Sequence, residues 1–221
     1  MPTQAISINV GLPREVIWRN LAVDTAIFKQ PVEGPIKVRK LNLDGDRQAD
    51  LTVHGGADKA VYAYPSEHYE YWRKQLPGAP LPWGSFGENL TTEGLGEDAL
   101  FIGDQLRVGS AVLRVTQPRM PCYKLGLRFQ RDDMVKRFLA SRRSGFYFSV
   151  IEEGEVTAGS PIEFLSRDPL RVSVSDIVSL YVDHQHPREL VERVLRLEAL
   201  PEIWKTWLNE RTSAGNSRRA Q

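Results

Sequence analysis

The stretch Ala111-Val112-Leu113-Arg114-Val115-Thr116-Gln117-Pro118-Arg119-Met120-Pro121-Cys122 decides the fold, because a strand pattern in it runs directly into a loop. Its first six residues alternate between two faces at the period of two that a β-strand gives. Two prolines then restrict the backbone on the way to the cysteine, so we expect an ordered loop at the end of this strand. The segment therefore predicts a rigid element that presents one thiol.

Other short segments of the first three quarters of the chain repeat the strand pattern. The predicted strands are Ile6 to Val10, Phe146 to Ile151 and Pro161 to Leu165, with a hairpin turn over residues 152–155. The predicted helices are residues 67–75, capped by Ser66, and residues 134–141, capped by Asp132. Many short strands with few helices favour a mixed, β-rich α+β barrel over a doubly wound sheet.

The last quarter of the chain has a different composition. No glycine occurs between Ser160 and Ala214, so turns are sparse there and helices are favoured. The predicted helices run from a cap at Ser173 or Ser175 to Tyr181, from Pro187 onward and from Pro201 onward. We therefore expect a small three-helix unit over residues 168–211, followed by a frayed end from Thr212.

The composition excludes several classes of protein. The 221 residues suggest one domain plus an appendage, and the net charge of +1 offers no pull toward nucleic acid or an anionic membrane. No apolar run reaches the roughly 18 residues that a membrane-spanning helix needs. Residues 1–6 lack the pattern of a secretory signal. The single cysteine has no partner for an internal disulfide, so we expect a cytoplasmic protein.

Cys122 is the first candidate for chemistry. Arg119 and Lys124 flank it, and nearby cations favour the thiolate over the thiol and lower its pKa. A thiolate acts as a nucleophile or as a ligand for a soft metal. The alternative is a buried cysteine that packs as a small apolar side chain.

A second candidate is the run His54-Gly55-Gly56-Ala57-Asp58-Lys59. Paired glycines let backbone N–H groups converge on an anion, Lys59 adds a positive charge, and His54 can donate, accept or bind metal. The alternative is a glycine turn capped by a histidine. A lipase-like oxyanion loop is excluded because the chain has no Gly-x-Ser-x-Gly elbow.

A third candidate is the glycine-rich run from Gly84 to Thr91. In it, Glu88 and Asn89 could hydrogen-bond a heterocycle, although a structural turn is the simpler interpretation. The sequence has neither the phosphate-binding nor the dinucleotide-binding glycine fingerprint.

Taken in order, these segments resemble the MOSC-domain proteins, a family named after the C-terminal domain of molybdenum cofactor sulfurase, and with the helical tail the chain resembles their YiiM-type subgroup. The matching pieces are Lys29 upstream of a proline, Gly45 to Asp50, His54 to Tyr64, Ser85 to Asn89, Ile102 to Asp104 and Gln117 to Cys122. The combination is specific, whereas each piece alone is not.

The resemblance implies a MOSC β-barrel-like domain over residues 1–166, a three-helix C-terminal domain over residues 167–213 and a flexible tail over residues 214–221. It also implies a molybdenum cofactor, a pterin-based group in which Cys122 is the protein ligand to molybdenum. The residues expected to contact or serve this cofactor are Lys29, His54, Gly55, Gly56, Asp58, Lys59, Asn89, Arg119 and Lys124. Of these, His54 and Asp58 are the candidates for proton delivery, and Asn89 is the candidate to recognise the pterin edge.

The resemblance further implies reduction of N-hydroxylated substrates, including hydroxylaminopurine-type bases, and hence detoxification. An external electron-donor protein is expected, together with a possible homodimer. The main alternative is a sulfur carrier in which Cys122 holds a persulfide for metal–sulfur cofactor assembly. A third hypothesis is a binding module whose helical tail recognises nucleic acid or a partner, and the near-neutral charge of that tail argues against nucleic acid.

Overall fold

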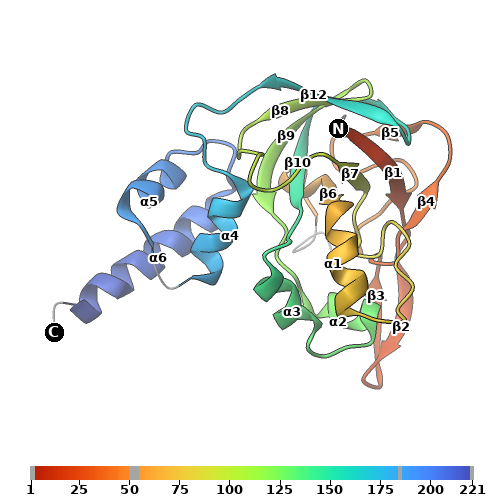
Figure 1. Cartoon of the computed structure of the whole chain (residues 1–221), viewed down its shortest axis with the longest axis horizontal. Helices are drawn as coiled ribbons and strands as arrows, with labels where there is room; N and C mark the ends of the chain where they lie inside the picture. The colour runs from red at the N-terminus through yellow and green to blue at the C-terminus, as the bar shows by residue number, and fades with distance from the viewer. Residues whose placement is uncertain (1–2, 50–54, 184–185, 220–221) are drawn as a thin grey trace.

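The computed structural model describes residues 3–49, 55–183 and 186–219, and it has a closed β-barrel at its centre (Figure 1). The barrel strands are β1 (Gln4–Val10), β6 (Val61–Pro65), β7 (Leu90–Glu93), β8 (Gln105–Val108), β9 (Ala111–Pro118), β10 (Phe146–Glu152) and β12 (Ser160–Ser166). They follow the order β12-β8-β9-β10-β6-β7-β1, and β1 pairs with β12 to close the sheet. The pair of β6 and β7 is parallel, and the others in the barrel are antiparallel.

Short strands and a hairpin decorate the barrel. The remaining strands are β2 (Arg14–Trp18), β3 (Leu21–Thr25), β4 (Gln30–Val32), β5 (Ile36–Val38) and β11 (Gly154–Val156). Strands β2 and β3 form a separate hairpin, β4 extends the sheet beyond β1, and β5 pairs with β11. The β-rich, mixed α+β class predicted from the sequence is confirmed.

The described part of the chain has six α-helices. They are α1 (Glu67–Gln75), α2 (Tyr123–Phe129), α3 (Met134–Ser141), α4 (Val174–Val182), α5 (Arg188–Leu195) and α6 (Glu202–Arg219). An aromatic cluster holds α1 and α3 against β6, and in it Trp72 Nε1 donates to the Tyr64 hydroxyl at 2.6 Å. None of the helices in the described part of the chain combines the length and the apolar character required to span a membrane.

The helical unit α4–α6 packs on the outer face of β9 (Figure 1). Seven of the eight residues of β9 are therefore buried, although a barrel strand ordinarily exposes every second side chain. Trp204 of α6 donates its indole N–H to Gln117 Oε1 of β9 at 2.9 Å. One apolar core continues from the barrel into these helices. The predicted cap is confirmed at Ser173, which forms a capping box with Asp176.

Five local predictions need correction. Ser66 precedes α1, but its side chain makes no cap hydrogen bond with the helix. Helix α2 was not predicted, because it has only seven residues and the cap position is held by Cys122 rather than by Ser, Thr, Asp or Asn. Asp133, not Asp132, precedes α3, and its carboxylate accepts from Arg131 and Arg137 instead of capping the helix.

The other two corrections concern element ends. Residues 152–155 do not form a hairpin turn before β12, because Gly154 already begins β11, which pairs with β5. Helix α6 continues to Arg219 instead of ending near Arg211, since a single glycine in this stretch costs a helix only about 1 kcal/mol. The predicted domain boundary at residues 166 and 167 stays a prediction.

Candidate functional site

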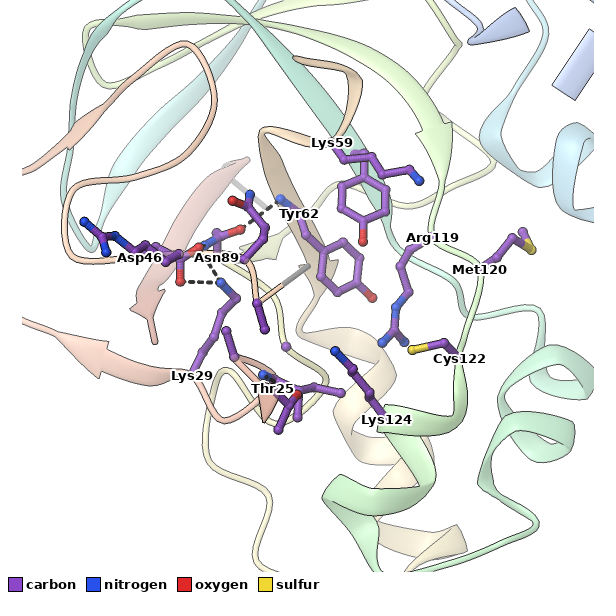
Figure 2. Close-up of a pocket in the computed structure, with 17 residues that line it drawn as sticks. Thr25, Lys29, Asp46, Lys59, Tyr62, Asn89, Arg119, Met120, Cys122 and Lys124 are labelled. Atoms are coloured by element: carbon purple, nitrogen blue, oxygen red, sulfur yellow. Dashed lines mark hydrogen bonds and ion pairs between the residues drawn. The ribbon is translucent and has the colours of Figure 1, made fainter. Parts of the chain in front are cut away.

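A cavity opens beside the end of β9, and Cys122 is part of its wall (Figure 2). Six separate segments meet there: the β3–β4 loop, the loop at residues 46–49, the stretch from Lys59 to Tyr62 at the start of β6, the stretch from Gly87 to Asn89 before β7, the β9–α2 loop with the start of α2, and β10. The lining residues are Thr25, Ala26, Ile27, Lys29, Asp46, Arg47, Gln48, Ala49, Lys59, Tyr62, Gly87, Asn89, Arg119, Met120, Cys122, Lys124 and Tyr147. The cavity therefore combines one thiol with several cationic side chains.

Cys122 lies half-buried at the first residue before α2, with an extended backbone. Its carbonyl oxygen accepts the Leu125 N–H at 2.9 Å, and the loop before it is held by the Arg119 N–H, which donates to the Gly145 oxygen at 3.3 Å. Figure 2 shows the sulfur directed toward the Arg119 guanidinium. The interpretation of Cys122 as a small apolar side chain in the core is therefore wrong, because the thiol faces a cavity lined by charged groups.

Arg119 is a buried cation at the back of this cavity, with an exposed fraction of 6%. Its guanidinium lies 5.4 Å from the Tyr62 ring centre and 5.1 Å from the Phe138 ring centre. Burial works against the charge, but Tyr62, Tyr147 and Cys122 raise the pKa of Arg119 above its ordinary value. Its Nη1 atom has no hydrogen-bond partner in the part of the chain that the structure describes. A buried guanidinium nitrogen without a partner can donate a hydrogen bond to an anion.

Two tyrosines face this guanidinium. Burial raises the pKa of Tyr62 well above its ordinary value, and its hydroxyl donates to the Ser144 oxygen at 2.9 Å. Burial also raises the pKa of Tyr147, with Arg119 acting in the opposite direction. Both hydroxyls therefore keep their protons at neutral pH and can act as donors.

A buried polar cluster closes the opposite wall of the cavity. Lys29 Nζ lies 2.5 Å from both carboxylate oxygens of Asp46. Asp46 also accepts from the Gly11 N–H at 2.8 Å and from Asn89 Nδ2 at 2.9 Å. The Asn89 Oδ1 in turn accepts the Tyr62 N–H at 3.1 Å. Lys29 and Asn89 thus line the cavity, and their polar groups already hydrogen-bond within its wall. Their predicted contact with the cofactor stays a prediction.

Lys59 and Lys124 bring two further amines to the cavity. Burial lowers the pKa of Lys59, and the charge of Asp58 opposes that shift. Lys124 Nζ donates to the Asp24 carbonyl at 2.9 Å, and Figure 2 shows its side chain rising from α2 into the same space as the thiol. Together with Arg47 and Arg119 they give the cavity a cationic lining.

Only part of the run from His54 to Lys59 lies at the cavity. Gly55, Gly56 and Asp58 are not among the residues that line it, and Asp58 is exposed. The Asp58 carbonyl instead accepts from Thr116 Oγ1 at 2.6 Å and from Gln117 Nε2 at 3.3 Å. Gly56 has a φ of 96°, which a glycine adopts without strain. His54 lies outside the described residues. The proposed roles of His54, Gly55, Gly56 and Asp58 stay predictions.

The run from Gly84 to Thr91 forms a structural turn around a buried carboxylate. Glu88 Oε1 accepts from the Gly84 N–H at 2.8 Å and from Thr91 Oγ1 at 3.1 Å. Its Oε2 accepts the Phe86 N–H at 3.1 Å, and the Tyr69 hydroxyl donates to the same carboxylate. Glu88 is thus committed to the fold and does not reach the cavity.

Sequence reasoning missed several residues of the cavity wall, above all Asp46, Tyr62 and Tyr147. Asp46 sits in a segment that the family pattern had marked, at residues 45–50, so a signal existed for it. Tyr62 likewise lies in the matching piece from His54 to Tyr64, whereas Tyr147 was interpreted only as a strand residue. They pair directly across β6 and β10, and their rings lie 5.1 Å apart, a contact that no local pattern reveals.

Comparison with known protein families places this geometry in context. The family model for the MOSC domain matches residues 50–163. The chain is 40% identical to YflK of Bacillus subtilis over 90% of both chains, and 36% identical to YiiM of Escherichia coli over 86% of both chains. It is also 34% identical to a protein named reductase from Gibberella moniliformis, over 70% of this chain but only 28% of that protein.

Solved structures agree with the sequence comparison. The crystal structure of YiiM from Geobacillus stearothermophilus superposes with a TM-score of 0.79 at 35% identity, over 95% of this chain and 99% of that one. YiiM from Escherichia coli superposes with a TM-score of 0.76 at 29% identity, over 97% and 94% of the two chains. The thiol at the mouth of a cationic cavity therefore lies on a shared architecture, and this chain belongs to the MOSC-domain family, as a relative of the YiiM proteins.

Proposed function

We propose that this protein is a molybdenum-cofactor-dependent reductase of N-hydroxylated compounds, including hydroxylaminopurine-type bases, and that it acts in their detoxification. The observation that carries the proposal is the cavity in which a half-buried thiol faces a buried arginine with an unpaired nitrogen. Membership of the MOSC family and the relative named reductase support it.

The donor set fits such a cofactor. A thiolate is a soft ligand, which suits a redox metal. Cys122 belongs to no cluster of three or more His, Cys, Asp or Glu side chains within the described ranges. A metal at its sulfur would therefore take most of its ligands from the group that carries it, as in a pterin-bound metal. The anionic part of that group would be held by Arg119 and Lys124, and a planar guanidinium is well suited to a phosphate.

When bound, the cofactor would supply a two-electron redox centre for cleavage of the N–O bond. The overall reaction consumes two electrons and two protons, converts R–NHOH into R–NH₂ and releases water. The protein contributes position and protons. Among the described residues, Lys59 Nζ is placed to deliver a proton, because burial lowers its pKa and because Lys59 lines the wall that also holds the thiol. His54 and Asp58 stay the candidates that the family resemblance implies.

The electrons would come from a separate donor protein of the flavoprotein or iron–sulfur class. The chain has no dinucleotide fingerprint of its own. The relative named reductase is much longer than this chain, since the match spans only 28% of its length. An external donor is therefore part of the proposal.

The test begins with protein expressed in a host that makes the molybdenum cofactor. We expect about one molybdenum and one pterin per chain in the wild type, and conversion of 6-hydroxylaminopurine to adenine with a reduced viologen as electron donor. In Cys122→Ser both the metal and the turnover should be lost. Tyr123→Phe, the adjacent exposed residue, is the matched control and should keep both.

Two outcomes would reject the proposal. One is metal-dependent reduction of the N–OH group by Cys122→Ser. The other is a wild-type protein without molybdenum whose intact mass shows one extra sulfur atom on Cys122, which would support the sulfur carrier instead.

A further inference from the structure

A second groove lies on the other side of Cys122, between the β9–α2 loop and the helical unit. Its lining residues are Lys59, Gln117, Pro118, Met120, Pro121, Cys122, Tyr147, Tyr181, Ile203, Trp204 and Trp207. The groove therefore joins the barrel to helices α4 and α6. Its wall is mainly aromatic and apolar, in contrast to the cationic cavity.

The groove and the cationic cavity meet at the thiol. Lys59, Met120, Cys122 and Tyr147 line both. Arg119, Lys124 and the Lys29–Asp46 cluster line the cavity alone, whereas the tryptophans of α6 line the groove alone. A molecule in the groove thus reaches the sulfur along a wall that does not include Arg119 or Lys124.

The aromatic wall is held in place before any ligand arrives. Trp204 is 9% exposed and is fixed by its hydrogen bond to Gln117. The Trp207 ring stacks on Tyr181 with centres 5.3 Å apart and an angle of 29° between the ring planes. It also meets the Trp204 ring edge-on at 6.0 Å. Rigid aromatic side chains bind a flat ring with little loss of conformational entropy.

We propose that this groove is the substrate-binding site and that it selects planar aromatic or heteroaromatic hydroxylamines, with their ring against Trp207 and their N–OH group toward Cys122. The proposal rests on the proposed function and adds the place where the substrate lies and the residues that recognise its ring. No carboxylate is among the residues that line the groove, and Lys59 is the one basic side chain among them, so no anionic group there pairs with a cationic substrate. Helix α6, from the C-terminal unit, thereby becomes the specificity element of a barrel enzyme.

Binding without turnover gives the first test. Isothermal titration calorimetry with adenine and with 6-hydroxylaminopurine is performed on the purified wild type, Trp207→Ala, Trp207→Phe and Trp18→Ala. We expect Trp207→Ala to weaken both ligands at least about fivefold, because stacking of a base on an aromatic ring is worth roughly a factor of 5 to 150. Trp207→Phe should recover most of the loss. Trp18→Ala is the matched control, because it removes a half-buried tryptophan from β2, away from the groove.

A second variant protects the test against misfolding. Ile203 is 74% exposed and lines the groove, so Ile203→Asp leaves the core intact and adds a carboxylate at the first turn of α6, where an acidic residue is favoured. This variant should weaken the binding of adenine and of 6-hydroxylaminopurine several-fold. Kinetics give a further measurement: in Trp207→Ala the KM for 6-hydroxylaminopurine should rise at least about fivefold at little change in kcat, whereas KM for hydroxylamine itself should stay within twofold.

Three results would overturn the inference: binding of both purines within twofold of wild type in Trp207→Ala and Ile203→Asp, equal loss for hydroxylamine and for the purine, or loss of molybdenum and pterin in Trp207→Ala. The last would assign the groove to the cofactor. These outcomes are separable from failure of the proposed function, which is decided by Cys122→Ser and by the metal content of the wild type.

Discussion

The buried ion pair between Lys29 and Asp46 gives a sharp test of how the cavity wall is built. Its side chains are 9% and 1% exposed, and the Asp46 carboxylate accepts from Lys29, from the Gly11 N–H and from Asn89 Nδ2. Asp46→Asn removes the negative charge and turns an N–H group toward donors. The Lys29 ammonium then remains buried without a counter-charge.

The expected cost of breaking this pair is large. Removing one partner of a buried ion pair costs about 3–5 kcal/mol, so Asp46→Asn and Lys29→Met should each lower the free energy of unfolding by that amount. The double variant Lys29→Met/Asp46→Asn leaves neither charge unpaired. Its cost should fall short of the sum of the single costs by at least about 2 kcal/mol, since the two residues are in direct contact.

The pH dependence has a definite sign. Burial lowers the pKa of Lys29 below 10.5, although Asp46 acts in the opposite direction. Between the lowered pKa and 10.5 the folded state binds fewer protons than the unfolded state, so the contribution of Lys29 to stability rises as the pH rises through this window. Asp46→Asn removes the opposing charge and extends the window to lower pH. This variant should therefore recover part of its lost stability at alkaline pH, whereas the double variant should not.

Urea unfolding, followed by tryptophan fluorescence at several pH values, gives the free energy of unfolding of the wild type, the two single variants and the double variant. A loss below about 1 kcal/mol in Asp46→Asn, or single losses that simply add, would refute the reasoning. Metal content of the double variant then separates two roles of Lys29. A stable double variant that binds molybdenum normally assigns Lys29 to the wall, and one that folds but loses the metal assigns it to cofactor contact.

Three further predictions follow from single sites. Arg119→Met should leave the unfolding free energy of the metal-free protein within about 1 kcal/mol of wild type in urea titrations, because it removes an unsatisfied buried nitrogen, but should abolish pterin retention. Glu88→Gln should lower the free energy of unfolding by about 1–3 kcal/mol in the same assay, because the amide nitrogen of the new glutamine would face an N–H or O–H donor instead of accepting from it. Ser173→Ala should cost about 0.5–2 kcal/mol by thermal or urea unfolding through loss of the α4 cap, and Ser173→Asp should restore most of it.

The barrel strands could be predicted from the sequence where one face is apolar and the period is clear. The strand at 111–118 and the helix cap at Ser173 are examples, since each depends on a pattern within ten residues. Helix α2 could not, because its stability comes from tertiary contacts: Leu125, Gly126 and Leu127 are buried. Gly126 is closely packed, and a Cβ there would lie 2.8 Å from the Arg131 carbonyl oxygen.

Part of the site was predictable because some of its residues lie close together in the sequence. Cys122, Arg119 and Lys124 lie within six residues of one another, so a local charge pattern indicated their joint role, and all three line the cavity. Tyr147 and Asp46 reach it from other strands and loops, so only the closed barrel brings them there. The aromatic groove required the docking of α6 on β9, which no local pattern of the sequence reveals.

The unsatisfied nitrogen of Arg119 links these features to function. Five buried polar side-chain atoms lack a partner in the described part of the chain, and Arg119 is the one among their residues that lines the cavity with Cys122. A folded chain keeps such a group only where the surroundings hold it, and here the Tyr62 and Phe138 rings stabilise the charge without using its N–H donors. The rings therefore let the barrel carry a cation whose Nη1 remains available. Replacing them by aliphatic residues should destabilise the charge itself, which is why the aromatic packing around α3 and β6 belongs to the site as much as to the core.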